Sequence, residues 1–350
     1  MKTIQLPFIL KLTLVLISVL CIGYLLVIGE SIIAPFFLAF LLALLFRPFA
    51  KYLEQKLKFP RLLSTFSSVF IILIVIVGLS IFFSLQLSDF SNDLPDLKEQ
   101  FETVFDDMQV WVENNIGINA TKQFDYIDKG LDELMSSSGV ILSFTVGMFS
   151  SSLGFLAFCL IFFIFILSYR RLLYNFLIHV FSNKHSGIVK QTVSEVEKMT
   201  KSYLIGVSIQ VLIVTILTSV ALAIFGVKYA ILLGVLTGII NIIPYVGITL
   251  SGIIACFFAF ATNSPITALY VLISYIVIHT IDGNIILPFV IGSKVKINAL
   301  FTFIGILIGA SLWGISGMFL CIPALAIIKI ITSKIDEVKA WSEVLGEGKS

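Results

Sequence analysis

Two ionisable side chains stand at the end of an apolar stretch, where charged groups are rare. Asp282 follows the apolar run 265–281 and precedes a shorter one, 285–291, and His279 stands three residues before it. If one helix carries both, the two side chains share a face. An acid at membrane depth normally faces a cavity or a partner, and a histidine beside a carboxylate is suited to carrying a proton. Asp282 and His279 are therefore the candidate ion-coupling residues; alternatively, they pair with each other at the end of a span.

A second candidate set lies where a long apolar run is interrupted. The run 229–262 carries Asn241, Pro244, Tyr245 and Gly247 at its middle. Proline removes a backbone donor and glycine permits a reversal of the chain, so this segment either kinks a helix for packing or exposes backbone groups to a solute. The side chains of Asn241 and Tyr245 can hydrogen-bond a polar solute. We take these four residues as candidate substrate-binding residues.

The motifs of membrane enzymes and pumps are missing from the sequence. It contains no H-E-x-x-H, no G-x-S-x-G and no Walker A sequence, and an intramembrane aspartyl protease would need a second buried aspartate. The four cysteines are Cys21, Cys159, Cys256 and Cys321. They lie far apart inside apolar runs, which indicates that they pack as small apolar side chains and do not form a metal or redox site. The sequence predicts a protein that is not an enzyme, with no catalytic residues, metal or cofactor.

The composition indicates what must surround these residues. Of the 350 residues, 58% are hydrophobic and 13% are charged, whereas soluble domains average about 45–50% apolar and about 25% charged. The apolar stretches are continuous over about 20 residues, while strands of a membrane barrel would alternate over about 10. We therefore expect an all-α, polytopic integral membrane protein with a lipid bilayer as its partner and no nucleic acid.

Hydropathy and charge divide the chain into six regions. We expect three spans in 1–87, an external amphipathic segment in 88–138, a fourth span in 139–168, a basic cytoplasmic connector in 169–201, a transport core with two broken segments in 202–333, and a cytoplasmic tail in 334–350. Within the external segment, helical spacing of apolar residues predicts two helices, over 94–111 and 124–134.

The charges of the connections predict the orientation. Lysine and arginine dominate 47–61 and 169–201, whereas 88–138 is rich in acids. The positive-inside rule places both basic segments in the cytoplasm and the acidic segment outside. Both termini are then cytoplasmic.

Two apolar runs leave the topology open. The runs 229–262 and 299–331 would each extend about 50 Å as one helix, too long for a hydrocarbon core of about 30 Å. Each has a break near its middle, the second at Gly314 and Gly317, which join the candidate substrate-binding residues. If each run spans once, the chain has eight spans. If each run is a re-entrant hairpin, six full spans remain. We prefer hairpins because they place Lys294 and Lys296 on the inside, as the positive-inside rule requires. A G-x-x-x-G precedes each break and allows close helix packing: Gly234/Gly238 and Gly305/Gly309.

The segment Asn241-Ile-Ile-Pro244-Tyr245-Val-Gly247 resembles the N-x-I-P-Y-x-G signature of the autoinducer-2 exporter (AI-2E) family of bacterial permeases. The family's next block is resembled here by Asp282-Gly283-Asn284, Pro288, Ile291-Gly292, Val295 and Asn298. The family's glycine-rich final segment is matched by Gly305, Gly309, Gly314, Gly317 and Pro323. The chain departs from the family at three positions: His279, which is often glutamine, and Ile248 and Ala299, which are often proline.

This resemblance implies a secondary transporter of the bacterial inner membrane and adds Asn284 to the candidate substrate-binding residues. The expected cargo is a small solute, either an autoinducer-type signalling molecule or another small polar metabolite, exported with the help of an ion gradient. A proton or a sodium ion would be the coupling ion. The alternatives are a sodium/proton antiporter, since the family includes members described so, and a passive pore. We also expect a homo-oligomer.

Overall fold

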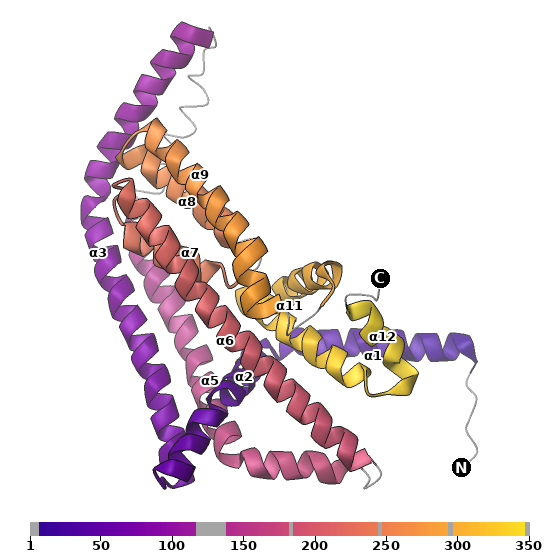
Figure 1. Ribbon diagram of the computed structural model, residues 1–350. Helices are drawn as coiled ribbons and strands as arrows, with labels where there is room; N and C mark the ends of the chain where they lie inside the picture. The colour runs from indigo at the N-terminus through magenta and orange to yellow at the C-terminus, as the bar shows by residue number, and fades with distance from the viewer. Residues whose placement is uncertain (1–6, 117–137, 182–184, 244–246, 293–296, 347–350) are drawn as a thin grey trace. The chain divides into compact units, whose positions relative to one another are not determined.

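The computed structural model describes residues 7–116, 138–181, 185–243, 247–292 and 297–346. Over these residues the chain is helical, with no β-strand and an isolated bridge between Ile297 and Gly346 (Figure 1). Among them, seven helices are long and apolar enough to cross a membrane, judged by length and composition. The predicted class, an all-α polytopic membrane protein, is confirmed.

The elements follow one another along the chain, and most are labelled in Figure 1. They are α1 (Phe8–Ile28), α2 (Glu30–Lys56), α3 (Arg61–Ile116), α5 (Ser138–Val180), α6 (Ser186–Ile224), α7 (Ala230–Ile240), α8 (Gly247–Thr262), α9 (Pro265–Ile281), the π-helices η2 (Asp282–Ile286) and η3 (Pro288–Gly292), α11 (Ala299–Thr332), the 3₁₀ turn η4 (Asp336–Val338) and α12 (Lys339–Leu345).

Helix α3 continues past the predicted end of the third span. It runs without a break from Arg61 to Ile116, so the first helix expected in the segment 88–138 is an extension of the span and not a separate element. The stretch from Ser80 to Asp93 contains no glycine or proline, and the helix also continues past Pro95. The second helix expected there, over 124–134, lies outside the described residues.

The chain folds as two compact units that alternate along the sequence. Unit 1 comprises 1–66, 154–201 and 295–350, and unit 2 comprises 67–153 and 202–294. The long helices α3, α5 and α6 each contribute to both units.

Unit 1 is built around α2, which packs against α1 and α11. Small residues on one side of α2 allow the close approach, because Ala39 and Ala50 are completely buried there. The ring of Phe46 meets that of Phe163 edge to face at 5.7 Å, and Phe163 is also completely buried. These contacts form the apolar interior of unit 1.

Ion pairs join the polar ends of the helices in unit 1. Three cross between elements: Arg170 with Glu54 (2.6 Å), Arg47 with Glu197, and Lys334 with Glu195 (2.8 Å). The first two pairs join the segments 47–61 and 169–201, and the third adds the chain after α11. The two basic segments therefore lie together at one end of unit 1, as expected of segments on the same side of a membrane.

Helix α11 is a hairpin and not a straight rod. Its backbone leaves the helical region at Trp313 and Gly314, where Gly314 has a φ of 56°. A Cβ on Gly317 would lie within 3 Å of the carbonyl oxygen of Gly309, and one on Gly305 would lie within 3 Å of the Leu325 side chain. Residues far apart in sequence thus touch, so the run 299–331 folds back on itself.

The hairpin of α11 is tied to its surroundings in unit 1 at both ends. The Trp313 indole donates from Nε1 to the carbonyl oxygen of Leu26 at 2.9 Å. That carbonyl belongs to the last turn of α1, where carbonyls lack partners within the helix. At the other end, the amide of Asn298 donates to the carbonyl of Leu345 at 2.9 Å. The tail after α11 therefore packs back on the start of the hairpin through α12.

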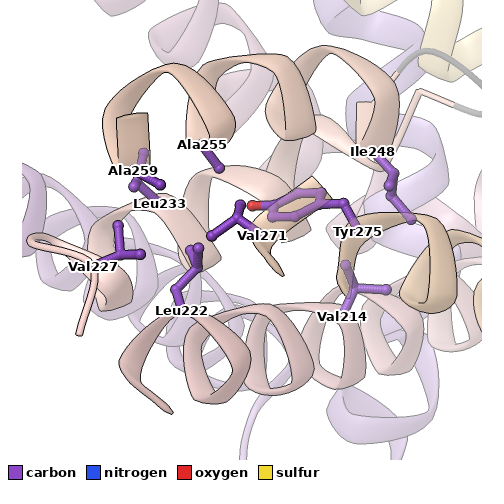
Figure 2. Packing of buried hydrophobic residues seen from close by; sticks show 9 residues of the cluster. All are labelled: Val214, Leu222, Val227, Leu233, Ile248, Ala255, Ala259, Val271 and Tyr275. Carbon is purple, nitrogen blue, oxygen red and sulfur yellow. The ribbon is translucent and has the colours of Figure 1, made fainter. Parts of the chain in front are cut away.

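Unit 2 has an apolar core formed by α6, α7, α8 and α9. Nine buried side chains meet in it, as Figure 2 shows: Val214, Leu222, Val227, Leu233, Ile248, Ala255, Ala259, Val271 and Tyr275. Helices α7 and α8 pack against each other. Gly247 at the start of α8 lies against Asn241 at the end of α7, whereas Leu233 near the start of α7 lies beside Ala259 near the end of α8 (Figure 2), so the two helices run in opposite directions. The run 229–262 is therefore also a helical hairpin.

Glycines bring α7 close to α6 in unit 2. A Cβ on Gly234 would lie within 3 Å of Ser219, and one on Gly238 would lie within 3 Å of Thr215. The G-x-x-x-G of this run therefore allows the close packing expected from the sequence.

The extension of α3 meets the connection between α6 and α7 in unit 2. The Lys228 ammonium lies 2.7 Å from the Asp93 carboxylate, and the Tyr229 hydroxyl also donates to that carboxylate. The ring of Phe90 packs against those of Tyr229 and Phe258, at 5.7 Å and 5.5 Å. The start of the acidic segment 88–138 therefore lies at the same end of unit 2 as the turn that precedes the α7–α8 hairpin.

Candidate functional site

Asp282 stands where the regular helix α9 changes into π-helix. The amide of Leu287 bonds to the carbonyl of Asp282, five residues earlier, which widens the turn. Pro288 follows at once and lacks an N–H, so the carbonyl of Asn284 has no donor at the α-helical spacing. Such widened turns are frequent at functional sites. Here the turn carries a buried carboxylate.

The Asp282 carboxylate accepts hydrogen bonds from two amide side chains. Nε2 of Gln210 lies 3.0 Å from both carboxylate oxygens, and Nδ2 of Asn241 lies 3.1 Å from Oδ2. The exposed fractions are 6% for Asp282, 5% for Gln210 and 6% for Asn241. Burying a carboxylate is costly unless its oxygens are hydrogen-bonded. The three side chains therefore form one buried polar cluster, which we call the Asp282 cluster.

Each member of the Asp282 cluster comes from a different element. Gln210 lies on α6, and Asn241 is the residue at which α7 ends, with its amide bonded to the carbonyl of Thr237 at 2.9 Å. Gly247, the first residue of α8, lies so close that a Cβ there would be within 3 Å of the Asn241 backbone. The start of α8 thus holds Asn241 in place, and glycine is needed for that contact.

A second buried polar contact joins the same helices. The hydroxyls of Thr237 on α7 and Tyr275 on α9 lie 2.8 Å apart, and the Thr237 hydroxyl also reaches the carbonyl of Leu233 at 2.7 Å. The Tyr275 ring packs against Gly252 of α8. Movement of α9 relative to the α7–α8 hairpin would therefore disturb this contact and the Asp282 cluster together.

The chemistry of the Asp282 cluster suits a small cation. One carboxylate and two amides offer four side-chain oxygens, because each amide can present its oxygen in place of its nitrogen. A proton on the carboxylate, or a cation beside it, would neutralise its charge and change which amide atoms face it. The cluster has no second acid among its members, so a single positive charge balances it.

The structure brings together only some of the residues expected from the sequence. Asn241 and Asp282 are in contact, and Gly247 packs beside them, whereas Pro244 and Tyr245 lie outside the described residues. His279 is exposed on another face of α9, and the amide partners of Asp282 are Gln210 and Asn241. Asn284 is exposed and donates to the carbonyl of Thr280 at 2.9 Å. Gly314 and Gly317 belong to unit 1, where they form the bend of α11.

Gln210 was not found by the sequence reasoning. A glutamine within the apolar run 202–226 is itself a signal, because a polar side chain inside a membrane span usually has a partner. Its partner could not be named, since Gln210 and Asp282 are 72 residues apart. Over the described parts of the chain, no three His, Cys, Asp or Glu side chains are grouped so as to hold a metal ion.

Comparisons with known proteins agree with this architecture. The chain is similar to YueF of Bacillus subtilis (strain 168), with 27% identity over 86% of this chain and 83% of YueF. It is similar to the AI-2 transport protein TqsA of Escherichia coli (strain K12), with 23% identity over 86% of each chain. PerM of the same strain is 24% identical over 46% of this chain and 44% of its own length.

The family comparison covers nearly the whole chain. The model of the AI-2E family transporters matches residues 14–337, a range that includes both hairpins, α9 and the Asp282 cluster. Together with the apolar helices, this makes the protein a multi-pass membrane protein with a role in transport. The chain belongs to the AI-2E family of transporters.

Proposed function

We propose that this protein is a secondary transporter that exports a small polar solute across the bacterial inner membrane and couples that movement to a proton or sodium gradient. In this proposal Asp282 binds the coupling ion, and the break between α7 and α8 contributes to solute binding. The name of TqsA refers to AI-2, which supports a small polar signalling molecule as the class of solute.

The observation that carries the proposal is the buried Asp282 carboxylate held by neutral amides. An ionisable side chain within an apolar span usually marks an ion or solute pathway. Gln210 and Asn241 satisfy the carboxylate without neutralising it. Within the described parts of the chain, no basic side chain pairs with this carboxylate, so an arriving cation or proton would meet its charge on a cluster of three elements.

Binding of the ion would change the packing of those elements. Once Asp282 is neutralised, it attracts the amide donors of Gln210 and Asn241 less strongly. Asn241 ends α7, and helix ends beside a chain break are the parts of transporters that commonly line solute sites. A change at the carboxylate would therefore reach the break between α7 and α8 directly.

A sodium/proton antiporter is the second candidate, and the composition of the Asp282 cluster favours it. A single carboxylate can hold either a proton or a sodium ion, but not both, which is the requirement for exchange. In that case cation exchange would need no organic solute. A passive pore, in contrast, would conduct without any dependence on a gradient.

The test is flux into proteoliposomes of the purified protein under an imposed pH or sodium gradient. Asp282→Asn keeps the size of the side chain but removes the charge that must be gained and lost. We expect gradient-driven accumulation to fall to the level of empty liposomes. Asp336→Asn in the exposed turn η4 is the matched control and should transport normally. Unchanged, ion-dependent accumulation by Asp282→Asn would contradict the proposal.

The orientation and assembly belong to the same proposal. We infer cytoplasmic termini and cytoplasmic segments 47–61 and 169–201, since these two segments share one end of unit 1 and both are basic. Single cysteines placed at Gln55 and Lys190 in a cysteine-free protein should react only from the inside, and one at Glu99 only from the outside. A homo-oligomer is expected, and chemical crosslinking in native membranes would detect it.

A further inference from the structure

Helices α8 and α9 enclose an open groove along one side of their antiparallel pair. The groove has a volume of about 690 Å³ and is lined by residues of these two helices, which lie next to each other in Figure 1. Pockets for small organic ligands usually measure about 300–1,000 Å³. The groove is therefore large enough for such a ligand.

Small residues form the bottom of the groove and large apolar residues form its sides. Cys256 and Ala268 are half-buried against the core of unit 2. The side chains of Phe257, Leu269 and Ile276 are exposed along the edges. This shape fits a narrow apolar chain lying along the helices.

The polar residues of the groove gather at one end. Because α8 and α9 are antiparallel, Thr249 at the start of α8 lies toward His279 and Thr280 at the end of α9. The opposite end is lined by Phe260 and Pro265. Among the described residues, no acid lines the groove, and the His279 imidazole offers an N–H donor. The groove is therefore complementary to a molecule with an apolar body and one acceptor head.

The direction of this polarity argues against an ordinary bilayer lipid. The span that contains α9 extends from Pro265 to Val290, and His279 lies about 21 Å along it from Pro265 at about 1.5 Å per residue. Centred in a core of about 30 Å, this span puts His279 near the midplane. A bilayer lipid has its head at the surface and its chain ends at the midplane, which is the opposite arrangement.

We propose that the α8–α9 groove binds a small amphiphile, an alkyl carboxylate, with its chain toward Pro265 and its carboxylate at His279. The polar end of the groove is close in sequence to the Asp282 cluster. Ile248 in the groove follows Gly247, which packs against Asn241, and His279 in the groove stands three residues before Asp282. The lining of the groove includes no member of the Asp282 cluster, so binding in the groove does not depend on the proposed function.

Photolabelling tests the groove without any measurement of transport. The probe is an alkyl carboxylate with a diazirine in its chain, applied to the purified protein in proteoliposomes, and the labelled peptides are identified by mass spectrometry. We expect labelling concentrated on α8 and α9. Cys256→Phe on α8 and Ala268→Phe on α9 each fill the groove, so each should remove most of the labelling. Ala223→Phe, at an exposed position on α6, should leave it unchanged.

The methyl ester of the same probe tests the polar end. The carboxylate probe should label the groove several-fold more than the ester, and His279→Leu should reduce the carboxylate probe to the level of the ester. Two results would overturn the inference and indicate general lipid contact. One is labelling spread equally over exposed apolar helices such as α1, and the other is labelling that neither Cys256→Phe nor Ala268→Phe reduces. Equal labelling by acid and ester would overturn the role of His279.

The two proposals can fail separately. If Asp282→Asn abolishes gradient-driven flux while groove labelling is unspecific, the proposed function stands and this inference is wrong. If labelling is specific but Asp282→Asn transports normally, the groove is a binding site and the coupling role of Asp282 is wrong.

Discussion

The two helical hairpins of this protein are made by similar sequences but are held together differently. In the α7–α8 hairpin, the chain break lies beside the buried Asp282 cluster, and Asn241 contributes a hydrogen bond to it. In the α11 hairpin, the two arms touch through the backbones of Gly309 and Gly317. Trp313 at its bend is bonded to the end of α1.

This difference separates structural from functional uses of the same pattern. Close backbone contact between glycines needs no polar side chain, so the α11 hairpin is explained by packing alone. A buried carboxylate, in contrast, costs folding free energy even when it is hydrogen-bonded. Its presence near the α7–α8 break therefore calls for a functional explanation, and the experiments below test whether the two hairpins differ in this way.

The largest effect is expected at the contact between the arms of α11. Gly317→Leu places side-chain atoms where the carbonyl of Gly309 lies, so the arms must separate. Overpacking usually costs about 1–3 kcal/mol, and a backbone neighbour cannot move aside as a side chain can, so we expect most of the protein to be lost from the folded fraction. Fluorescence-detected size-exclusion chromatography measures this. Gly78→Leu, at an exposed glycine with open space around it, should behave as the unchanged protein.

The next effect concerns the Asp282 cluster. Gln210→Leu removes the donor that serves both oxygens of the carboxylate. Leaving a buried charged acceptor short of partners should lower the stability by about 1–3 kcal/mol. In a protein that already carries Asp282→Leu, the same change should cost much less, because no carboxylate remains to be satisfied. Equal losses in both backgrounds, measured by thermal unfolding in detergent, would mean that Gln210 acts through packing.

A smaller effect is expected at the bend of α11. Trp313→Phe keeps an aromatic ring but loses the N–H that serves the Leu26 carbonyl. The net contribution of such a bond is about 0.5–1.5 kcal/mol, so the melting temperature should fall slightly. Gradient-driven flux per folded molecule should not change, whereas a change in ion dependence would connect the α11 hairpin to coupling. Trp341→Phe, at an exposed tryptophan, is the matched control.

The smallest effect is a pH-dependent one at the contact between α3 and the α6–α7 connection. Hydrogen bonds from the Lys228 ammonium and then the Tyr229 hydroxyl hold the pKa of Asp93 below its usual range. Because the pKa is lower in the folded state, the pair stabilises the protein above the unfolded value of about 3.9. That stabilisation is lost as the pH falls through the folded-state pKa.

This predicts how Asp93→Asn should behave in thermal unfolding. Its deficit in melting temperature should be constant between about pH 7 and pH 5 and should shrink as the pH falls below about 4. The contact is largely open to solvent, so added salt should also reduce the deficit. A deficit that grows on acidification would show that the sign of the linkage is wrong.

Much of the architecture could be predicted from the sequence because it depends on local composition. Runs of apolar residues predict the membrane helices, and Pro244 and Gly314 mark the interruptions at 241–247 and 313–317. The continuation of α3 was missed because the change from apolar to acidic residues near position 88 suggested a boundary. A change of side-chain polarity does not by itself interrupt the backbone hydrogen bonding of a helix, and α3 continues through it and past Pro95.

The partners of Asp282 were decided by the tertiary structure alone. The sequence indicated that this acid needs a partner and offered His279, one helical turn away. In the folded protein the partners come from α6 and the end of α7. Helical spacing determines which residues share a face, but the rotation and packing of neighbouring helices determine what that face meets. The packing of α9 against the α7–α8 hairpin turns Asp282 toward the amides and leaves His279 at the groove.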